Sequence, residues 1–292
     1  MPSVATLFES RRFGVLTVIR LLGSGAEGNV WLTANESGVE YAVKEYLTSR
    51  SRGGRNMYMS REMAAQTTLG EHPNILRMLD TAMRLSICSL TKDDLRARVR
   101  MSTAVVYPYY PMGDMVDFSE RRYSLPSSES IDGARLAMRG LWRAIEHCHS
   151  RNICHRDVKP QNILFDHWND SVVLSDFGLS TGRTGITNPG TSLIYSAPEC
   201  PATTRCKLEP YDSKCDIWSA GAVEAAMLWG DKIIYSGERG AKFRKKGYRY
   251  FVTEHPRLWN ALPSSSKQVL ASSLIPSPKH RATAGEIVRM MA

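Results

Sequence analysis

The first third of the chain alternates between apolar and polar residues in short runs, a pattern typical of β-strands. The predicted strands cover residues 13–22, 30–32, 40–46 and 103–107, with a glycine-rich turn between the first two. One helix is predicted in this region, over residues 61–69. Residues 84–100 are polar and basic, which indicates an insertion between two strands.

Beyond about residue 114 the pattern becomes helical. A helix over residues 131–149 is expected to bury Ile131, Leu136, Met138, Leu141, Ile145 and Cys148. Residues 215–229 predict a second apolar helix, and residues 264–291 predict two short helices interrupted by Pro276 and Pro278. The sequence therefore predicts an α+β protein in which a small mixed region precedes a larger helical one.

The length and net charge of the chain restrict the possible domain organisation and binding partners only slightly. The 292 residues suffice for one large domain or two tightly joined lobes. A net charge of +9 suits nucleic acid, an anionic membrane or an acidic protein as a partner, although a nucleotide-binding enzyme with a basic surface is the simpler interpretation. The densest basic run, residues 242–249, is either a solvated face or a docking patch for an acidic partner. Aromatic and basic residues interleave nowhere else, so we expect no specific nucleic-acid binding.

The six cysteines form no CxxC pair and no cluster with zinc spacing. Reduced thiols are typical of intracellular proteins, so we expect the protein in the cytoplasm, the nucleus or both. We also expect it to be a monomer. The N-terminus lacks the pattern of a signal peptide. The most apolar stretch, residues 220–229, is too short to cross a bilayer and contains Glu224, so no membrane span is expected.

A glycine-rich segment at residues 22–30 reads Leu-Gly-Ser-Gly-Ala-Glu-Gly-Asn-Val. Glycines let the backbone approach phosphate oxygens and present N–H groups to them. A GxGxxG pattern also marks dinucleotide sites, where a helix follows the glycines. A predicted strand follows here, and the dinucleotide interpretation is therefore rejected.

Lys44 and Glu62 follow the glycine segment in an informative order. Lys44 ends the run Ala42-Val43-Lys44 on a predicted strand, and Glu62 lies on the predicted helix. A lysine in such a strand ordinarily points to solvent, and a helical glutamate ordinarily lies on the surface. The order favours a different interpretation, in which Lys44 contacts the α- and β-phosphates of a nucleotide and Glu62 holds it in place.

The most specific signals are two polar loops. Residues 155–162 read His-Arg-Asp-Val-Lys-Pro-Gln-Asn, which places Asp157 and Asn162 five positions apart. Residues 175–178 read Ser-Asp-Phe-Gly and add a second carboxylate, Asp176. Phosphoryl transfer needs metal ligands, a lysine that clamps the phosphates and a carboxylate that orients the attacking oxygen. The two loops supply the carboxylates and the amide, and Lys44 supplies the lysine.

In this order, the segments resemble the eukaryotic-type protein kinase family, from about residue 13 to residue 291. Ala197-Pro198-Glu199, residues 212–221 and Arg281 extend the match. The resemblance implies a bilobal α+β fold, with a small β-rich N-lobe that contains one main helix and a larger, mostly helical C-lobe. The implied boundaries are an extension over residues 1–12, an N-lobe over 13–107, a hinge over 108–114 and a C-lobe over 115–292.

The resemblance also implies roles for individual residues, with ATP and Mg²⁺ as cofactors and proteins as substrates. Asp157 would be the catalytic base, Lys159 would contact the γ-phosphate, and Asn162 and Asp176 would bind the metal. The implied ATP-binding residues are Leu22, Gly23, Ser24, Gly25, Ala26, Glu27, Gly28, Val30, Ala42, Lys44, Glu62, Tyr107, Pro108, Tyr110, Asp114 and Leu164. Tyr107 would occupy the gatekeeper position.

Three further implications concern structure, specificity and regulation. Glu199 and Arg281 would form a buried ion pair, and Asp216 would brace the catalytic loop. Lys159, two residues after Asp157, is typical of serine/threonine kinases rather than tyrosine kinases. Arg156, alone or with Arg61, would form a cationic pocket that lacks a partner until a phosphate arrives, with Thr187 or Thr184 as the activating phosphosite; constitutive activity is the alternative.

Three other functions compete with this interpretation. A catalytically inactive scaffold is disfavoured because Lys44, Asp157 and Asp176 are all present. A nucleic-acid or membrane binder lacks a supporting motif. A small-molecule phosphotransferase would lack Ala197-Pro198-Glu199, which shapes a peptide-binding platform. Two departures from the family pattern stand out: Gln66 occupies a position that is usually apolar, and Ala26-Glu27 replaces the usual tip of the glycine loop.

Overall fold

The computed structural model of this chain describes residues 6–25, 27–46, 57–86, 102–117, 127–165, 172–182, 184, 186, 194–200, 210–230, 234 and 237–291. It separates into two compact units. The N-terminal unit contains Met1–Gln66 and Leu76–Tyr110, and the C-terminal unit contains Thr67–Ile75 and Pro111–Ala292.

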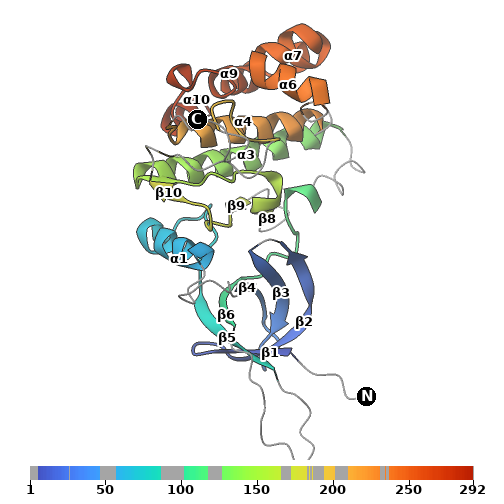
Figure 1. The fold of residues 1–292 in the computed structure, drawn as a ribbon. Coiled ribbons are helices and arrows are strands. Elements are labelled where there is room, and N and C mark those ends of the chain that lie inside the picture. The colour runs from blue at the N-terminus through green and yellow to red at the C-terminus, as the bar shows by residue number, and fades with distance from the viewer. Residues whose placement is uncertain are drawn as a thin grey trace, which may run out of the picture. The chain divides into compact units, whose positions relative to one another are not determined.

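The N-terminal unit is an antiparallel sheet with most of one helix (Figure 1). Its strands are β1 (Thr6–Ser10), β2 (Gly14–Ser24), β3 (Gly28–Ala34), β4 (Glu40–Tyr46), β5 (Asp80–Ser86) and β6 (Thr103–Pro108). Helix α1 covers Met57–Leu69. Strands β2, β3, β4, β6 and β5 pair in that order, and β1 pairs with both β2 and β5.

The two faces of β4 have different neighbours, because side chains alternate along a strand. Val43 lies opposite Val106 of β6 and belongs to a buried cluster with Phe8 and Leu16. Ala42, Lys44 and Tyr46 share the other face of the strand. The alternation read from the sequence therefore directs Lys44 away from the apolar core.

Strand β1 was not predicted from the sequence. It lies within residues 1–12, which were expected to form an extension, and its backbone pairs with two strands. Ser10 at its end donates a hydrogen bond of 2.5 Å from Oγ to Oδ2 of Asp80. Phe8 has no exposed surface, so this strand contributes to the core of the N-terminal unit.

The C-terminal unit is mainly helical (Figure 1). Its helices are α3 (Ser127–Ser150), α4 (Lys214–Trp229), α6 (Gly237–Lys246), α7 (Arg249–Glu254), α8 (Pro256–Ala261), α9 (Ser264–Ser273) and α10 (Ala284–Met290), with the short 3-10 turns η1 (Pro160–Asn162) and η2 (Pro278–His280). Two small antiparallel sheets are present: β7 (Ile153–Cys154) pairs with β10 (Thr181–Gly182), and β8 (Ile163–Phe165) forms a hairpin with β9 (Val172–Leu174). The β8–β9 hairpin carries the two polar loops at its ends.

Helix α3 is the central element of the C-terminal unit and packs against α4, α10 and β9. Met138, Leu141, Ile145 and Cys148 are buried, as the sequence predicted. Leu136 was expected on the same face, but 53% of its surface is exposed, so that prediction is wrong. Position 136 lies two residues from Met138, which corresponds to roughly 200° around the helix and to the opposite side.

The other predicted elements occur close to their expected bounds, including the strand at 40–46, the helix α4 and the interrupted helices α9 and α10. Helix α1 begins four residues earlier than predicted, at Met57. The expected insertion at residues 84–100 lies largely outside the described residues, and its first three residues complete β5.

Candidate active site

The glycine segment forms the turn between β2 and β3, and a strand follows it as the sequence predicted. The N–H of Gly25 donates to the carbonyl of Gly28 over 2.9 Å, which closes the turn. A Cβ atom at Gly28 would lie 1.9 Å from the carbonyl oxygen of Glu45, so only glycine fits there. At Gly23 and Gly25 no described atom lies within 4 Å of such a Cβ. Ala26 lies outside the described residues.

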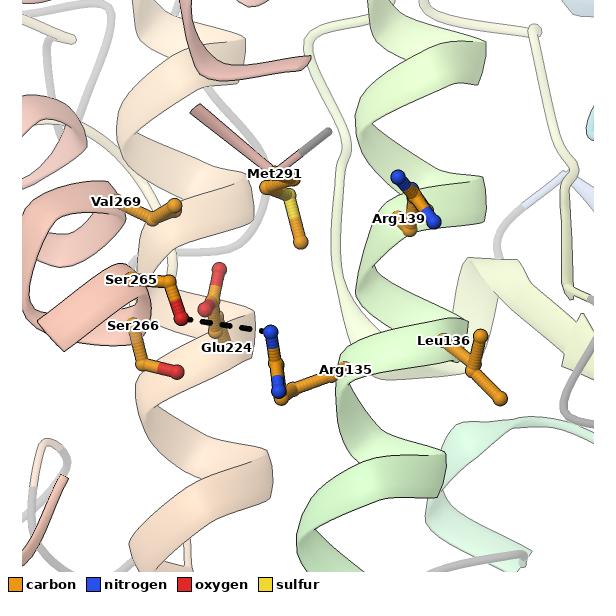
Figure 2. Close-up of a pocket in the computed structure, with 8 residues that line it drawn as sticks. All are labelled: Arg135, Leu136, Arg139, Glu224, Ser265, Ser266, Val269 and Met291. Atoms are coloured by element: carbon orange, nitrogen blue, oxygen red, sulfur yellow. Dashed lines mark hydrogen bonds between the residues drawn. The ribbon is translucent and has the colours of Figure 1, made fainter. Parts of the chain in front are cut away.

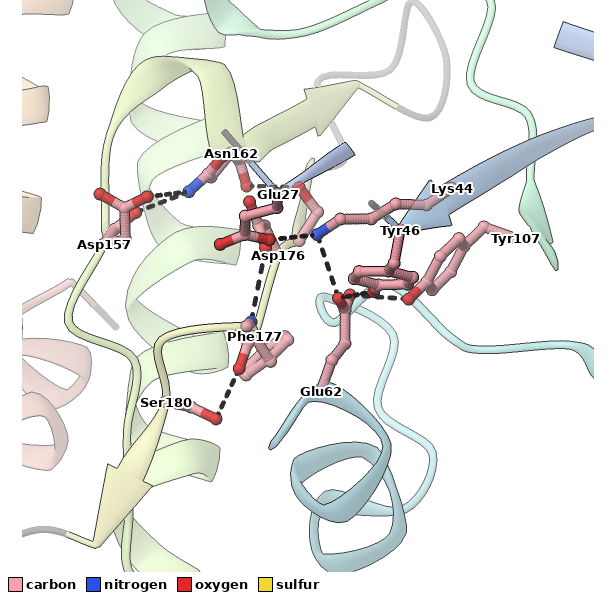
Figure 3. Close-up of polar contacts among 12 residues, drawn as sticks. Glu27, Lys44, Tyr46, Glu62, Tyr107, Asp157, Asn162, Asp176, Phe177 and Ser180 are labelled. Atoms are coloured by element: carbon pink, nitrogen blue, oxygen red, sulfur yellow. Dashed lines mark hydrogen bonds and ion pairs between the residues drawn. The ribbon is translucent and has the colours of Figure 1, made fainter. Parts of the chain in front are cut away.

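Lys44 pairs with Glu62, as the sequence predicted (Figure 3). The distance between Nζ of Lys44 and Oε2 of Glu62 is 3.1 Å, and Glu62 is only 1% exposed. A buried carboxylate is costly unless charges and hydrogen bonds compensate it. Two further donors, the hydroxyls of Tyr46 and Tyr107, bind the same carboxylate, and nothing in the sequence pattern indicated them.

Lys44 has a second carboxylate partner that was not predicted. Oε2 of Glu27, in the glycine turn, lies 2.9 Å from Nζ of Lys44. The two side chains remain partly exposed, at 12% for Lys44 and 18% for Glu27. The ammonium group of Lys44 is therefore shared between a helix residue and a residue of the glycine turn.

Gln66, the unusual polar residue on α1, has partners at both ends of its amide. Nε2 donates to the carbonyl of Leu76 over 2.7 Å, and Oε1 accepts from the N–H of Met78 over 3.3 Å. A buried amide whose nitrogen and oxygen are both hydrogen-bonded costs less than one left without partners. The polar side chain therefore joins α1 to the segment that precedes β5 instead of disturbing the helix.

The remaining residues expected to contact nucleotide fall into both units. Leu22, Val30, Ala42, Pro108 and Tyr110 are half-buried in the N-terminal unit, where Tyr107 is buried and Ser24 bonds Asn29. In the C-terminal unit, Asp114 and Leu164 lie side by side in a β-bridge. Oδ1 of Asp114 accepts the N–H groups of Val116 and Asp117, so this carboxylate also caps the short turn that follows it.

The catalytic loop places three predicted side chains together in the C-terminal unit. Two of them, Asp157 and Asn162, are shown in Figure 3. Oδ2 of Asp157 lies 2.6 Å from Nζ of Lys159 and 3.1 Å from Nδ2 of Asn162. The same Nδ2 donates to the carbonyl of Asp157 over 2.8 Å. Asp157 and Asn162 are five positions apart in the sequence, and they come into contact because the 3-10 turn η1 folds Asn162 back onto Asp157.

His155 connects this loop to the loop that contains Asp176. Its Nδ1 accepts the N–H of Asp157, so its Nε2 carries the proton and donates to the carbonyl of Ser175 over 2.9 Å. Ser175 in turn donates its N–H and its hydroxyl to the carbonyl of Asn162. The two polar loops are therefore held in a fixed relation to each other.

Two residues of these loops have left-handed backbones. Asp176 has a φ of 64° and Arg156 a φ of 72°, values that are uncommon for residues other than glycine. Such conformations cost about 1–3 kcal/mol each and cluster at functional sites. Phe177 beside Asp176 is fully buried, with its ring centroid 4.7 Å from that of His155.

Asn162 and Asp176 fit the metal role that the sequence predicted for them. Because the amide nitrogen of Asn162 faces Asp157, its amide oxygen is the atom turned to other partners. A carboxylate and an amide oxygen form the donor set that Mg²⁺ prefers. The chemistry of the described side chains is therefore compatible with a magnesium site.

Asp216 braces the catalytic loop, as predicted. Its Oδ2 accepts the N–H of His155 and its Oδ1 that of Arg156, both over 2.8 Å. Burial alone would raise the pKa of Asp216, but the hydrogen bond and charge of His149 hold that pKa at about 2. The brace stays ionised at any ordinary pH.

A cluster of thiols lies next to this brace. Sγ of Cys154 and Sγ of Cys215 are 3.6 Å apart, and with Asp216 they offer three ligand atoms within 4.8 Å of one another. The four described cysteines, Cys148, Cys154, Cys200 and Cys215, are free and buried. Both oxygens of Asp216 already accept backbone N–H groups, so the cluster is explained by packing around the brace.

Glu199 and Arg281 form the predicted ion pair. Nη1 and Nη2 of Arg281 lie 2.5 and 2.7 Å from the two oxygens of Glu199. The guanidinium also donates to the carbonyls of Lys214, Ile275 and Pro276. The Arg281 side chain has no exposed surface, so this pair ties the Ala-Pro-Glu segment to the C-terminal helices.

Arg156 does not lack partners, contrary to the sequence-based expectation. Its Nε donates to the hydroxyl of Tyr211 over 3.2 Å, and its Nη1 donates to the carbonyl of Leu179 over 3.1 Å. Of the two candidate phosphosites, Thr184 is exposed and Thr187 lies outside the described residues. A phosphate near Arg156 would compete with neutral partners that are already bound.

The basic run at residues 242–249 is divided between helices α6 and α7. Arg244 is half-buried and donates to the carbonyl of Ala197 over 3.1 Å. Lys246 pairs with Glu254 over 2.7 Å. Lys242, Lys245 and Arg249 are exposed. Part of the run therefore serves the structure of the C-terminal unit.

A pocket of about 300 Å³ lies among α3, α4, α9 and the residue after α10 (Figure 2). Its lining combines Arg135, Leu136, Arg139, Glu224, Ser265, Ser266, Val269 and Met291. Glu224 is buried, and an oxygen of its carboxylate accepts the indole N–H of Trp142 over 3.2 Å. Burial raises the pKa of Glu224 to about 7.

Glu224 should make stability depend on pH. An acid whose folded pKa exceeds its unfolded value binds more protons in the native state, so its contribution to stability falls as pH rises from about 4.5 to about 7. Glu224→Gln removes the titration and keeps an acceptor for Trp142. We expect the variant to gain stability relative to the parent protein at pH 8 but not at pH 5, measured by urea unfolding. If the stability difference between Glu224→Gln and the parent protein is the same at pH 5 and pH 8, the prediction is wrong.

None of the helices in the described part of the chain combines the length and apolar character that a bilayer crossing requires.

The glycine turn with its Lys44–Glu62 pair forms one group of side chains, and the two polar loops with Asp157, Asn162 and Asp176 form the other. These two groups distinguish protein kinases among α+β proteins. This chain belongs to the protein kinase family: the family model described as protein kinase domain matches residues 16–291.

Three curated relatives illustrate the match. The chain is 30% identical over 285 residues to the probable serine/threonine-protein kinase MARK-C of Dictyostelium discoideum, covering 94% of this chain and 32% of that protein. It is 25% identical to serine/threonine-protein kinase SBK1 of Mus musculus, covering 94% and 62%. It is 27% identical to CBL-interacting serine/threonine-protein kinase 16 of Arabidopsis thaliana, covering 98% and 57%. The chain thus spans between about a third and three-fifths of the length of these relatives.

Proposed function

We propose that this chain transfers the γ-phosphate of ATP to serine or threonine residues of protein substrates, with Mg²⁺ as the metal. The observation that carries the proposal is the catalytic loop, in which Asp157 contacts both Lys159 and Asn162. Lys159 supports serine/threonine specificity, and the relatives named above are serine/threonine kinases by name. Ala197-Pro198-Glu199, anchored by Arg281, supports protein rather than small-molecule substrates.

Each side chain has a defined task in this proposal. The carboxylate of Asp157 accepts the proton of the substrate hydroxyl as its oxygen attacks, and the ammonium of Lys159 stabilises charge on the transferred phosphoryl group. Lys44 orients the phosphates that remain on the nucleotide. Asn162 and Asp176 would hold Mg²⁺, which neutralises phosphate charge when it is bound.

Domain boundaries remain part of the proposal. We assign residues 13–292 to the kinase domain, with an N-lobe over 13–107, a hinge over 108–114 and a C-lobe over 115–292. The division between compact units after Tyr110 supports this assignment. The backbone pairing of Thr6–Ser10 supports counting part of the preceding extension with the N-lobe. The free thiols of the four described cysteines support an intracellular location. An acidic docking partner at 242–249 would meet Lys242, Lys245 and Arg249.

The direct test is transfer of radiolabelled phosphate from ATP to a degenerate peptide library, with Asp157→Asn as the inactive control. We expect label on serine and threonine, lost in the control. Label on tyrosine alone would contradict the specificity, and no label with Mg²⁺ present would contradict the activity.

Glu27 is expected to weaken ATP binding. Its carboxylate forms an ion pair with the ammonium of Lys44, and the phosphates of ATP would have to compete with it for that ammonium. Partly exposed ion pairs are worth at most about 1 kcal/mol. Glu27→Gln should therefore lower the KM for ATP about two- to fivefold. Steady-state kinetics at varied ATP measures this, with Glu36→Gln at an exposed position as the matched control. An unchanged or higher KM in the Glu27 variant counts against the competition.

We also propose regulation by phosphorylation of Thr184 or Thr187. The exposure of Thr184 and the position of Arg156 in the same unit support this. A phosphate would form charge-assisted bonds stronger than the neutral ones that Arg156 now makes. The variant with both threonines changed to alanine should lose activity relative to the phosphorylated parent. Full activity in this variant would mean that the kinase is constitutive.

A further inference from the structure

Three polar side chains of the N-terminal unit share one face of its sheet. Lys44 and Tyr46 are two residues apart on β4, so both point to the same side. Tyr107 lies on β6 opposite Ala42, and residues directly opposite in antiparallel strands also share a face. Strand register therefore brings Lys44, Tyr46 and Tyr107 together on the face that α1 covers with Glu62.

All three side chains bind the carboxylate of Glu62 (Figure 3). The hydroxyl of Tyr107 donates to Oε1 over 2.7 Å. The hydroxyl of Tyr46 donates to Oε2, which is also 3.1 Å from Nζ of Lys44. Each oxygen of Glu62 thus has at least one tyrosine donor.

The hydroxyls are reliable donors because they stay protonated. Tyr46 is 2% exposed and Tyr107 is 3% exposed. Burial raises the pKa of both hydroxyls well above the ordinary value, and the negative charge of Glu62 raises it further. Both hydroxyls therefore remain donors at ordinary pH.

The lysine alone holds Glu62 less firmly than the three donors together. Lys44 divides its ammonium between Glu62 and Glu27, and the glycine turn that carries Glu27 would bind phosphate during catalysis. Hydrogen bonds to a buried charged group contribute more than neutral ones, and leaving such a group short of donors is expensive.

We propose that Tyr46 and Tyr107 are positioning residues, whose hydroxyls hold Glu62 on α1 in the orientation that pairs with Lys44. This inference rests on the proposed function, because it gives Lys44 its task in phosphate transfer. The contacts lie entirely within the N-terminal unit. Thr184 belongs to the C-terminal unit and supplies none of these contacts.

Kinetics of Tyr46→Phe, Tyr107→Phe and the double variant test this role. Phenylalanine keeps the buried ring and removes only the donor. We expect each single change to lower kcat about tenfold, the equivalent of about 1.4 kcal/mol, with a smaller effect on the KM for ATP. Tyr41→Phe is the matched control, since Tyr41 lies on the same strand but packs on the opposite face against Phe13.

A double-mutant cycle with Glu62→Gln separates positioning from general destabilisation. If the hydroxyls act through Glu62, adding Tyr107→Phe to Glu62→Gln should change kcat by less than about twofold. Additive losses would overturn the proposal, as would single phenylalanine variants with the activity of the parent protein.

Amide hydrogen exchange across α1 provides a measurement that does not require activity. We expect exchange of Met57–Leu69 to accelerate in the double phenylalanine variant but not in Tyr41→Phe. Unchanged exchange overturns the positioning role, whether or not the protein transfers phosphate. A parent protein that labels no peptide while the double variant loses protection of α1 would refute the kinase proposal and leave the tyrosine contacts established.

Discussion

Replacing Asp157 with asparagine should lower kcat for peptide phosphorylation by about a thousandfold, within the range that a general base contributes. Asparagine keeps the size of the side chain and can still contact Lys159 and Asn162, but it cannot accept the proton of the substrate hydroxyl. The KM for ATP should stay within about threefold, because the lost interaction matters mainly in the transition state.

Steady-state kinetics on a peptide chosen from the library measures both constants. Asp80→Asn is the matched control, because it makes the same chemical change at a carboxylate that bonds Ser10 in the N-terminal sheet. A loss of less than tenfold at Asp157 would show that another group accepts the proton.

Arg281→Met is expected to destabilise the C-terminal unit by about 3–5 kcal/mol, the usual result of removing one partner of a buried ion pair. The change leaves Glu199 without its bidentate partner and removes donors from the carbonyls of Lys214 and Ile275. Urea unfolding followed by tryptophan fluorescence reports the loss, because the Arg281 guanidinium lies 5.3 Å from the centre of the Trp218 ring.

Two companion variants test the cause. Arg289→Met changes an exposed arginine on α10 and should shift stability by no more than about 0.5 kcal/mol. Adding Glu199→Met to Arg281→Met should recover part of the loss, since no unpaired buried charge then remains. If the double variant is less stable than the single one, charge burial is not the cause.

Site contacts could be predicted from the sequence where the residues involved lie within a few positions of one another. Asp157, Lys159 and Asn162 lie within six positions, and a single short turn brings them into contact. The Lys44–Glu62 pair was also predictable, because the alternation of β4 and the order of elements left few other arrangements. Roles in nucleotide and metal binding remain predictions, since they concern contacts beyond the chain itself.

Contacts that depend on strand register or on distant segments could not be predicted. The tyrosine donors to Glu62 require the pairing of Ala42 with Tyr107, which alternation alone does not specify. The partners of Gln66 are backbone atoms of Leu76 and Met78, and backbone atoms leave no signature in a side-chain pattern. Leu136 was misplaced because apolar content was counted without its angular position on the helix.

Strand β1 has a practical consequence for anyone who shortens the chain to the segment that most resembles a kinase. A protein that starts at Phe13 would lose Thr6–Ser10 and leave unpaired N–H and C=O groups along β2 and β5. Unpaired strand edges recruit other chains and promote aggregation. Thr6–Ser10 therefore protect the edges of β2 and β5, and they belong in any version of this protein made for crystals or assays.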